Sequence, residues 1–87
     1  MFMYYVYILL MSNKLVYTGY TSDLKRRVLE HKSGGNITTR KHLPVKLIFY
    51  EAFCNEADAR RREEYLKTSK GKTTLRLMLS EFFREQI

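Results

Sequence analysis

The chain has very few residues of the kinds that form covalent or metal cross-links. It contains one cysteine, Cys54, so no internal disulfide can close, and its cysteine and two histidines lack the spacing of a zinc site. Its longest apolar stretch, residues 2–11, is too short to cross a bilayer and lacks the basic segment and cleavage site of a signal peptide. We therefore expect a cytoplasmic protein that does not insert into a membrane.

Linkers, internal repeats and low-complexity segments are also missing from the sequence. A length of 87 residues is enough for one core but not for two. The hydrophobic content of 45% and the aromatic content of 14% are sufficient for a packed core and argue against disorder. We expect residues 1–87 to form a single domain.

Acidic residues are scarce relative to basic ones. The chain has 9 acidic and 16 basic residues, which gives a formal net charge of +7. Such a charge attracts polyanions and speeds their capture, and nucleic acid is the obvious polyanion. Because solubility alone also favours an excess of one charge, the composition is compatible with nucleic-acid binding but does not establish it.

Two apolar stretches at the start of the chain predict an antiparallel hairpin. Residues 3–10 are apolar on both faces, which is typical of a central strand, and residues 15–20 form the returning strand. The polar residues 12–14 between them have the length of a hairpin turn.

The rest of the chain predicts one more strand and three helices. The first expected helix is capped by Thr21 or Ser22, has Asp23 in its first turn and ends near Lys32. A polar, mobile loop at 36–42 and a strand at 45–53 should follow. The second helix should run from a cap at Asn55 to Lys67, and after a break at 69–72 a final helix should span about 73–84. We predict an α+β fold in which a small, three-stranded, mostly antiparallel sheet is flanked by helices, in the order β-β-α-β-α-α.

The register of the hairpin predicts which side chains lie together. If residues 12–14 form the turn, Leu9 pairs with Tyr17 and Tyr7 pairs with Gly19. Tyr7 and Tyr17 are then diagonal neighbours on one face of the sheet, about 7–8 Å apart. Gly19 leaves open backbone beside the tyrosines, where a ligand could approach closely.

Two of the helices carry polar residues on faces that should be buried. In the first helix, Leu24 and Val28 mark the inward face, and Arg27 and His31 fall on the same stripe. In the second helix, Glu63 lies on the apolar stripe. A carboxylate in such a place is costly unless a cation or hydrogen-bond donors meet it.

We expect these inward polar residues to converge with the tyrosines on one face of the sheet and to form a functional site. Each residue also has a structural interpretation. A buried tyrosine or histidine can be an ordinary hydrogen-bonded core residue, and Arg27 and Glu63 could form a structural ion pair with each other.

The same residues resemble the motifs of the GIY-YIG endonuclease superfamily. Tyr5-Val6-Tyr7 and Tyr17-Thr18-Gly19 are similar to its two tripeptides, Asp23-Leu24-x-x-Arg27-x-x-x-His31 is similar to its helix motif, and Glu63 matches its metal-binding glutamate. Tyr5 and Thr18 replace a glycine and an isoleucine that have no chemical role in the family. Further landmarks resemble the small stand-alone bacterial members of the UPF0213 group: Gly34, Thr39-Arg40, residues 44–47 and residues 62–67.

The resemblance implies a nucleic-acid phosphodiesterase, an endonuclease that hydrolyses DNA with one divalent metal ion. By this analogy Glu63 holds Mg²⁺ or Mn²⁺, Arg27 grips a phosphate oxygen and Tyr7 is the general base. Tyr17 and His31 orient water and phosphate, or His31 relays the proton. A free tyrosine titrates near 10, so Tyr7 needs nearby positive charge to lower its pKa.

Basic residues outside this cluster are candidates for contacts with the nucleic-acid backbone. With Gly19 they give four predicted nucleic-acid-binding residues: Gly19, Arg40, Lys41 and Lys67. Such contacts position a nucleic acid without reading its sequence. We expect a monomer or a weak homodimer.

Two alternatives without catalysis remain open. The first is a nucleic-acid-binding module that stacks bases on its tyrosines, although stacking has no use for the inward Glu63. The second is an interaction protein with a vestigial nuclease site, in which Phe82 and Phe83 of the final helix pack against a partner or a second copy.

Overall fold

Three strands form one antiparallel sheet in the order β2-β1-β3. The computed structural model describes residues 2–86, so the two ends of the expected domain, residues 1 and 87, lie outside the described residues. The central strand β1 spans Tyr4–Leu10, and its neighbours are β2, Val16–Thr21, and β3, Lys46–Phe53. The predicted hairpin register is confirmed: Tyr7 pairs with Gly19 and Leu9 pairs with Tyr17.

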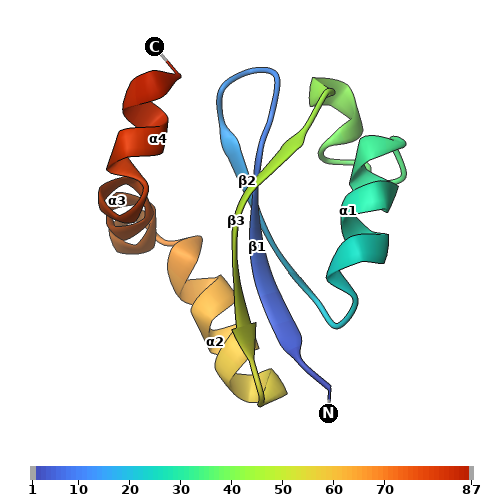
Figure 1. Cartoon of the computed structure of the whole chain (residues 1–87), viewed down its shortest axis with the longest axis vertical. Helices are drawn as coiled ribbons and strands as arrows, with labels where there is room; N and C mark the ends of the chain where they lie inside the picture. The colour runs from blue at the N-terminus through green and yellow to red at the C-terminus, as the bar shows by residue number, and fades with distance from the viewer. Residues whose placement is uncertain (1, 87) are drawn as a thin grey trace.

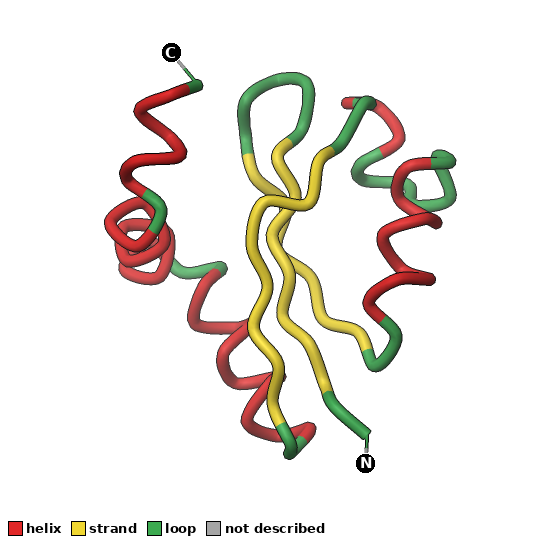
Figure 2. The backbone as a smooth tube through the Cα atoms, in the orientation of Figure 1, coloured by secondary structure: helices red, strands yellow, loops and turns green. Residues whose placement is uncertain are grey.

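Helices cover both faces of this sheet (Figure 1). Helix α1, Leu24–Lys32, lies on one face. The other face carries three helices: α2, Glu56–Leu66; α3, Ser69–Met78; and α4, Ser80–Glu85. A short 3-10 turn, η1, spans Arg40–His42 between α1 and β3 (Figure 2). The predicted α+β class and the order of strands and helices are confirmed.

The core is divided by the sheet into two apolar layers. Successive side chains of a strand point to opposite faces, so β1 contributes to both layers. Val6 and Ile8 pack with Ala59 and Leu66 of α2 on one side. Tyr7, Leu9 and their neighbours form the second layer, under α1. All residues from Val6 to Leu10 are buried, which confirms that β1 is the central strand.

The cap of α1 differs from the prediction. Thr21 is the last residue of β2, and the N-cap is Asp23, whose carboxylate accepts a hydrogen bond from the backbone N–H of Arg26. The hydroxyl of Thr21 instead accepts from the backbone N–H of Asp23. The expectation that Thr21 or Ser22 caps the helix was wrong because the strand continues one residue further and uses the threonine hydroxyl in the turn.

The predicted break at residues 69–72 is also wrong, since these residues form the first turn of α3. Thr68 caps that helix by accepting a hydrogen bond from the backbone N–H of Gly71 at 3.0 Å. A side chain at Gly71 would collide with the carbonyl oxygen of Tyr65 at the end of α2. Gly71 is therefore needed for the close approach of the two helices, and a second interruption at Leu79 separates α3 from α4.

The segment at 36–42 is more ordered than the expected mobile loop. It contains η1, and Thr39 has no exposed surface at all. The Asn36 side chain accepts hydrogen bonds from the backbone N–H groups of Thr38 and Thr39, which folds the segment back on itself. Within residues 2–86, none of the helices is long and apolar enough to cross a membrane.

Candidate active site

Tyr7 is at the centre of a buried polar cluster between β1 and α1. Its hydroxyl is 2.8 Å from Nε2 of His31 and accepts a hydrogen bond from Nε of Arg27 at 3.3 Å. Its ring lies over Gly19 of β2, and neither Tyr7 nor His31 has exposed surface. The helical stripe that the sequence predicts therefore does place Arg27 and His31 against the sheet, on the face that carries the tyrosine.

His31 is held by hydrogen bonds on both nitrogens of its ring. Nδ1 lies 2.8 Å from Oγ1 of Thr39, opposite the contact with Tyr7. Arg27 can only donate, so the Tyr7 hydroxyl, which is shielded from water, directs its own hydrogen at Nε2 of His31. This requires the tautomer with the proton on Nδ1, which then donates to Thr39. The contacts order the three side chains as a chain of donors from Tyr7 to Thr39.

The charge state of the cluster follows from its burial. Burial raises the pKa of Tyr7 to about 12, although the hydrogen bond from Arg27 acts in the opposite direction. Burial, with the nearby charge of Arg27, lowers the pKa of His31. Both side chains are neutral at pH 7. Arg27 thus acts on the pKa of Tyr7 in the expected direction, but desolvation is the larger effect.

Tyr17 and Arg27 form the more exposed side of the cluster. The Tyr17 ring centroid lies 6.3 Å from that of Tyr7 and 5.0 Å from that of His31, and the side chain is half-buried. Arg27 keeps 32% of its side chain exposed, and its Nη1 is 3.8 Å from a carboxylate oxygen of Glu30. Because Tyr7 is enclosed and Tyr17 is half-enclosed, neither offers an open ring for base stacking.

Glu63 approaches the cluster from the other side of the sheet. Its helix α2 packs against the Val6 and Ile8 face, so the expectation that all candidate residues converge on one face is wrong for Glu63. Alternation along β1 places Tyr7 and Val6 on opposite faces of the sheet. The helical period of α2 shows which side of that helix is buried, but it does not show which face of the sheet the helix covers. The pKa of Tyr7 is raised mainly by burial, and the negative charge of Glu63 raises it further. The Glu63 carboxylate is therefore close enough to act electrostatically on the tyrosine.

Glu63 pairs with a lysine of its own helix end and not with Arg27. Its carboxylate oxygen is 3.0 Å from Nζ of Lys67, and only 18% of the glutamate side chain is exposed. The structural ion pair between Arg27 and Glu63 that the sequence left open is not formed. The carboxylate is thus shielded, held in place, and already faces a cation.

A divalent ion would find one protein carboxylate here. Residues 2–86 contain no group of three or more His, Cys, Asp or Glu side chains arranged to hold a metal. Mg²⁺ commonly binds through one or two carboxylates and completes its shell with water and substrate phosphate. The shielded Glu63, whose partner Lys67 is 54% exposed and free to move away, fits a site of that kind.

The other predicted binding residues occupy different places. Arg40 and Lys41 are exposed in η1, next to Thr39, and Lys67 contacts Glu63. The expectation that Gly19 leaves open backbone for a ligand is wrong, because the ring of Tyr7 fills that space and would collide with any side chain there. Gly19 therefore serves the packing of Tyr7.

Two residues of the cluster were not predicted as site residues. In the sequence Thr39 is only a landmark of the family resemblance, and Glu30 lies outside the apolar stripe of its helix although it contacts Arg27 and Arg26. The loop between Lys32 and Lys46 is irregular, so no periodicity in the sequence indicates that Thr39 reaches His31. The one signal in the sequence is that a buried histidine needs a hydrogen-bond partner for its second ring nitrogen, and this does not say which residue provides it.

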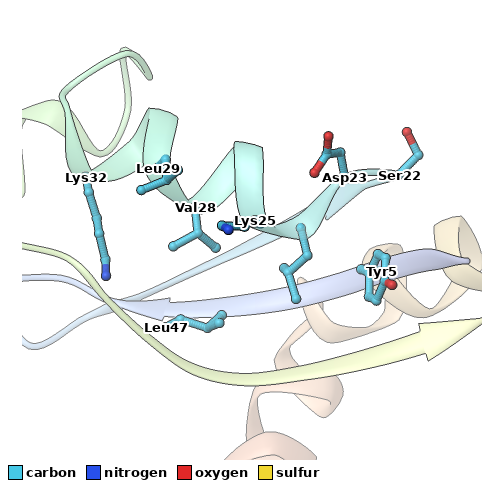
Figure 3. A pocket seen from close by; sticks show the side chains of 9 residues that line it. Tyr5, Ser22, Asp23, Lys25, Val28, Leu29, Lys32 and Leu47 are labelled. Carbon is cyan, nitrogen blue, oxygen red and sulfur yellow. The ribbon is translucent and has the colours of Figure 1, made fainter.

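A groove of about 590 Å³ also runs along α1, beside the cluster (Figure 3). Tyr5 and Leu47 form its floor on the sheet, Val28 and Lys32 point toward the sheet from the helix, and Leu29 also lines the groove. None of the five candidate catalytic residues lines it. The groove is therefore separate from the Tyr7 cluster.

Two tyrosine-bearing antiparallel strands, a helix that supplies arginine and histidine, and a glutamate on the helix after the third strand define a nuclease-type fold of the GIY-YIG class. The chain belongs to the GIY-YIG family: the pattern of the GIY-YIG catalytic domain matches residues 3–76. Members of this family act on nucleic acid and generally use a divalent metal.

Relatives in the UPF0213 group are similar over most of their length. A UPF0213 protein of Clostridium perfringens is 39% identical over 85 residues, which are 97% of this chain and 91% of that protein. A UPF0213 protein of Haloquadratum walsbyi is 44% identical over 66 residues, 75% and 74% of the two chains. The solution NMR structure of a UPF0213 protein from Bacillus halodurans superposes on this structure with a TM-score of 0.57 and is 37% identical in sequence. The match covers 87% of this chain and 84% of that one. The shared fold and the family are thus established together.

Proposed function

We propose that this protein is an endonuclease that hydrolyses phosphodiester bonds of DNA with one divalent metal ion. The observation that carries the proposal is the Tyr7 hydroxyl, which is held between Arg27 and His31 inside an otherwise apolar layer. A purely structural tyrosine needs one hydrogen-bond partner, and a cation is a costly choice in such a place. A site that binds a phosphate and moves a proton uses both partners.

Arg27 controls access to Tyr7 in this proposal. Its Nε now donates to the tyrosine oxygen, and the side chain is exposed enough to turn toward a bound phosphate. When its donors move to a non-bridging oxygen, the oxygen of Tyr7 becomes available to a water molecule. Substrate binding and uncovering of the base are then one event.

The raised pKa of Tyr7 keeps its hydroxyl protonated at neutral pH, so it cannot act as a phenolate. It can still act as a general base if it gives up its own proton as it accepts one from water. The attacking water gives its proton to the Tyr7 oxygen while the Tyr7 hydrogen passes to Nε2 of His31, 2.8 Å away. His31 is able to accept it because its lowered pKa leaves it neutral. Thr39 accepts the hydrogen bond from Nδ1 of His31, and Tyr17 orients the water and phosphate beside the histidine ring.

Glu63 is the residue that would hold the metal ion, either Mg²⁺ or Mn²⁺. The ion supplies stabilisation of the charge that develops on the leaving oxygen. Lys67, released from Glu63, then becomes a donor for the nucleic-acid backbone, and Arg40 and Lys41 extend the same contacts past η1.

The proposal treats residues 1–87 as one GIY-YIG-like domain, which the match to residues 3–76 supports. It includes a cytoplasmic location, where bacterial DNA lies, and a monomer or weak homodimer. Phe82 and Phe83 pack edge to face on each other at 5.5 Å, and cations lie over both rings. Much of the apolar surface expected to attract a second copy is therefore already covered.

The alternative function is nucleic-acid binding without hydrolysis, on a vestigial site. The observation in its favour is the pKa of Tyr7, which is raised to about 12 and so opposes a phenolate base. This reading predicts binding that needs no metal and no Glu63.

The test is incubation of the purified protein with supercoiled plasmid and with nicked, branched and single-stranded DNA, in Mg²⁺, Mn²⁺ or EDTA. The proposal predicts cutting of at least one substrate in either metal and none in EDTA. Tight binding of DNA with every substrate left intact would favour the alternative.

A further inference from the structure

A basic groove lies between the hairpin loop and α3, away from the Tyr7 cluster. It consists of two adjoining pockets, of about 430 and 160 Å³, which share Arg76 and Phe83 in their walls. We call it the α3–hairpin groove. Lys14 of the hairpin loop lines one pocket and Lys72 of α3 lines the other, so cations from distant parts of the sequence meet there.

Three of the four cations that line this groove are not neutralised by neighbouring acids, and the fourth, Arg84, pairs with Glu81. Among residues 2–86, no Asp or Glu lines either pocket, and none of Lys14, Lys72 and Arg76 forms a salt bridge. By contrast, five of the arginines elsewhere in the chain pair with a carboxylate on a nearby turn or strand: Arg26, Arg27, Arg60, Arg61 and Arg62. The groove therefore presents charge that an anionic partner can meet.

Lys14 is held in a backbone conformation that lysine rarely adopts. Its φ is +71°, in the left-handed region, where glycine or asparagine is the usual residue. The loop is closed by hydrogen bonds from Lys14 N to Met11 O at 3.0 Å and from Met11 N to Leu15 O at 2.9 Å. A glycine would relieve the strain, so the turn alone does not explain a lysine at this position.

We propose that the α3–hairpin groove holds the phosphodiester backbone of a single nucleic-acid strand that leads to the candidate site. The proposal rests on the proposed function and adds the route of the substrate. Val16 lines the groove and precedes Tyr17 of the cluster on β2. Because β2 is an edge strand, a strand of nucleic acid can pass around it from one face of the sheet to the other.

Three features favour a single strand over other anions or a duplex. Cations spread over two elements match a repeating phosphate chain better than one compact anion. Phe83 lies in the wall with Arg76 over its ring, and a combination of arginine and aromatic side chains is typical of grooves that bind single strands. A pocket of about 160 Å³ between a loop and a helix is too small for a double helix.

The test measures binding of a fluorescein-labelled single strand by anisotropy, in EDTA, over a series of salt concentrations. Three proteins are compared with the wild type: Lys14→Gly, the pair Lys72→Gln with Arg76→Gln, and the control pair Lys25→Gln with Lys32→Gln. The control removes the same charge from the groove along α1 (Figure 3). Thermal unfolding of each variant is recorded, and a duplex of the same sequence serves as a second probe.

We expect each lost phosphate contact to reduce the slope of log K against log salt by about 0.7 on the single strand. Lys14→Gly should lose one contact and show a Tm equal to or above that of the wild type. In the variant with Lys72→Gln and Arg76→Gln the slope should fall by about 1.4, and the control pair should keep the wild-type slope. The duplex should be affected less than the single strand.

Wild-type slopes in both groove variants, or an equal loss in the control pair, would overturn the groove assignment. An equal loss on the duplex would overturn the single-strand assignment. Because binding is measured without metal, failure of the groove leaves the nuclease proposal to be judged by metal-dependent cutting of DNA. Loss of binding in the groove variants without any cutting by the wild type would retain the groove and reject the nuclease.

Discussion

The hydroxyl oxygen of Tyr7 lies 2.8 Å from Nε2 of His31, and both residues are completely enclosed. One comes from the central strand and the other from the helix above it, 24 positions later in the chain. The contact joins the phosphate-binding candidate Arg27 to Thr39 through one continuous set of hydrogen bonds.

Tyr7→Phe removes the hydroxyl and leaves Nε2 of His31 buried without a partner. We expect a loss of about 1–3 kcal/mol in the free energy of unfolding and a fall in cleavage rate of about 10²- to 10⁴-fold. Chemical denaturation and a plasmid-cutting assay measure the two effects. Tyr5→Phe is the matched control, since Tyr5 lies on the same strand and packs edge to face on Tyr50. Equal effects of the two changes would contradict the role of Tyr7.

Thr39→Val keeps the shape of the side chain but removes the partner of His31 Nδ1. The unsatisfied Nδ1–H should cost about 1–3 kcal/mol in the free energy of unfolding, while the hydrogen bond from Tyr7 to Nε2 keeps the tautomer of His31. Chemical denaturation measures the loss, and nitrogen NMR shifts of the imidazole report whether the tautomer is kept. Thr38→Val is the control because Thr38 is exposed and its side chain makes no hydrogen bond among the described residues. A free energy of unfolding equal to that of Thr38→Val would remove Thr39 from this set of hydrogen bonds.

The main features of the fold could be predicted because they depend on local pattern. The three polar residues of the turn fix the register, and alternation along β1 then sets Tyr7 opposite Gly19. Helical phase placed Arg27 and His31 on the buried stripe with Val28. These inferences need only the periods of a strand and a helix.

The features that the sequence did not reveal depend on contacts between elements. Gly71 reads as a helix breaker, yet it allows α3 to begin against the end of α2. The face of the sheet that α2 covers is set by the path of the chain after β3, so the period of α2 alone does not reveal on which face Glu63 lies. Thr39 reaches His31 from an irregular loop that has no period to read.

The stability of the protein should depend on pH through His31. Its pKa is lowered in the folded state, so below the ordinary histidine value near 6.5 the unfolded chain binds a proton that the folded chain does not. The contribution of His31 to the free energy of unfolding is therefore full above pH 6.5 and falls as the pH is lowered toward the folded-state pKa. His31→Gln keeps polar groups but does not titrate. The difference in unfolding free energy between wild type and His31→Gln should shrink from pH 7 to pH 5, and a constant difference would contradict this sign.

Gly19→Ala should disrupt the cluster without touching its polar atoms. A methyl group at this position would collide with the ring of Tyr7. Overpacking of this kind costs about 1–3 kcal/mol in the free energy of unfolding, and the Tyr7 ring must leave the position in which its hydroxyl contacts His31. A double-mutant cycle with Tyr7→Leu measures the coupling, because the smaller side chain makes room for the methyl group. Additive effects would show that the two residues do not share this space.

The central claim is that Glu63 serves metal-dependent hydrolysis and is not simply an ion-pair partner of Lys67. The most direct measurement is the rate of DNA cutting in Mn²⁺ or Mg²⁺ by wild type, Glu63→Gln and Glu64→Gln, with direct Mn²⁺ binding to each protein in the presence of DNA. Glu64 is the matched control, as the exposed neighbour on the same helix. The account predicts that Glu63→Gln loses both cutting and Mn²⁺ binding while Glu64→Gln keeps them. Cutting by Glu63→Gln at the wild-type rate, or equal loss in both variants, would contradict it.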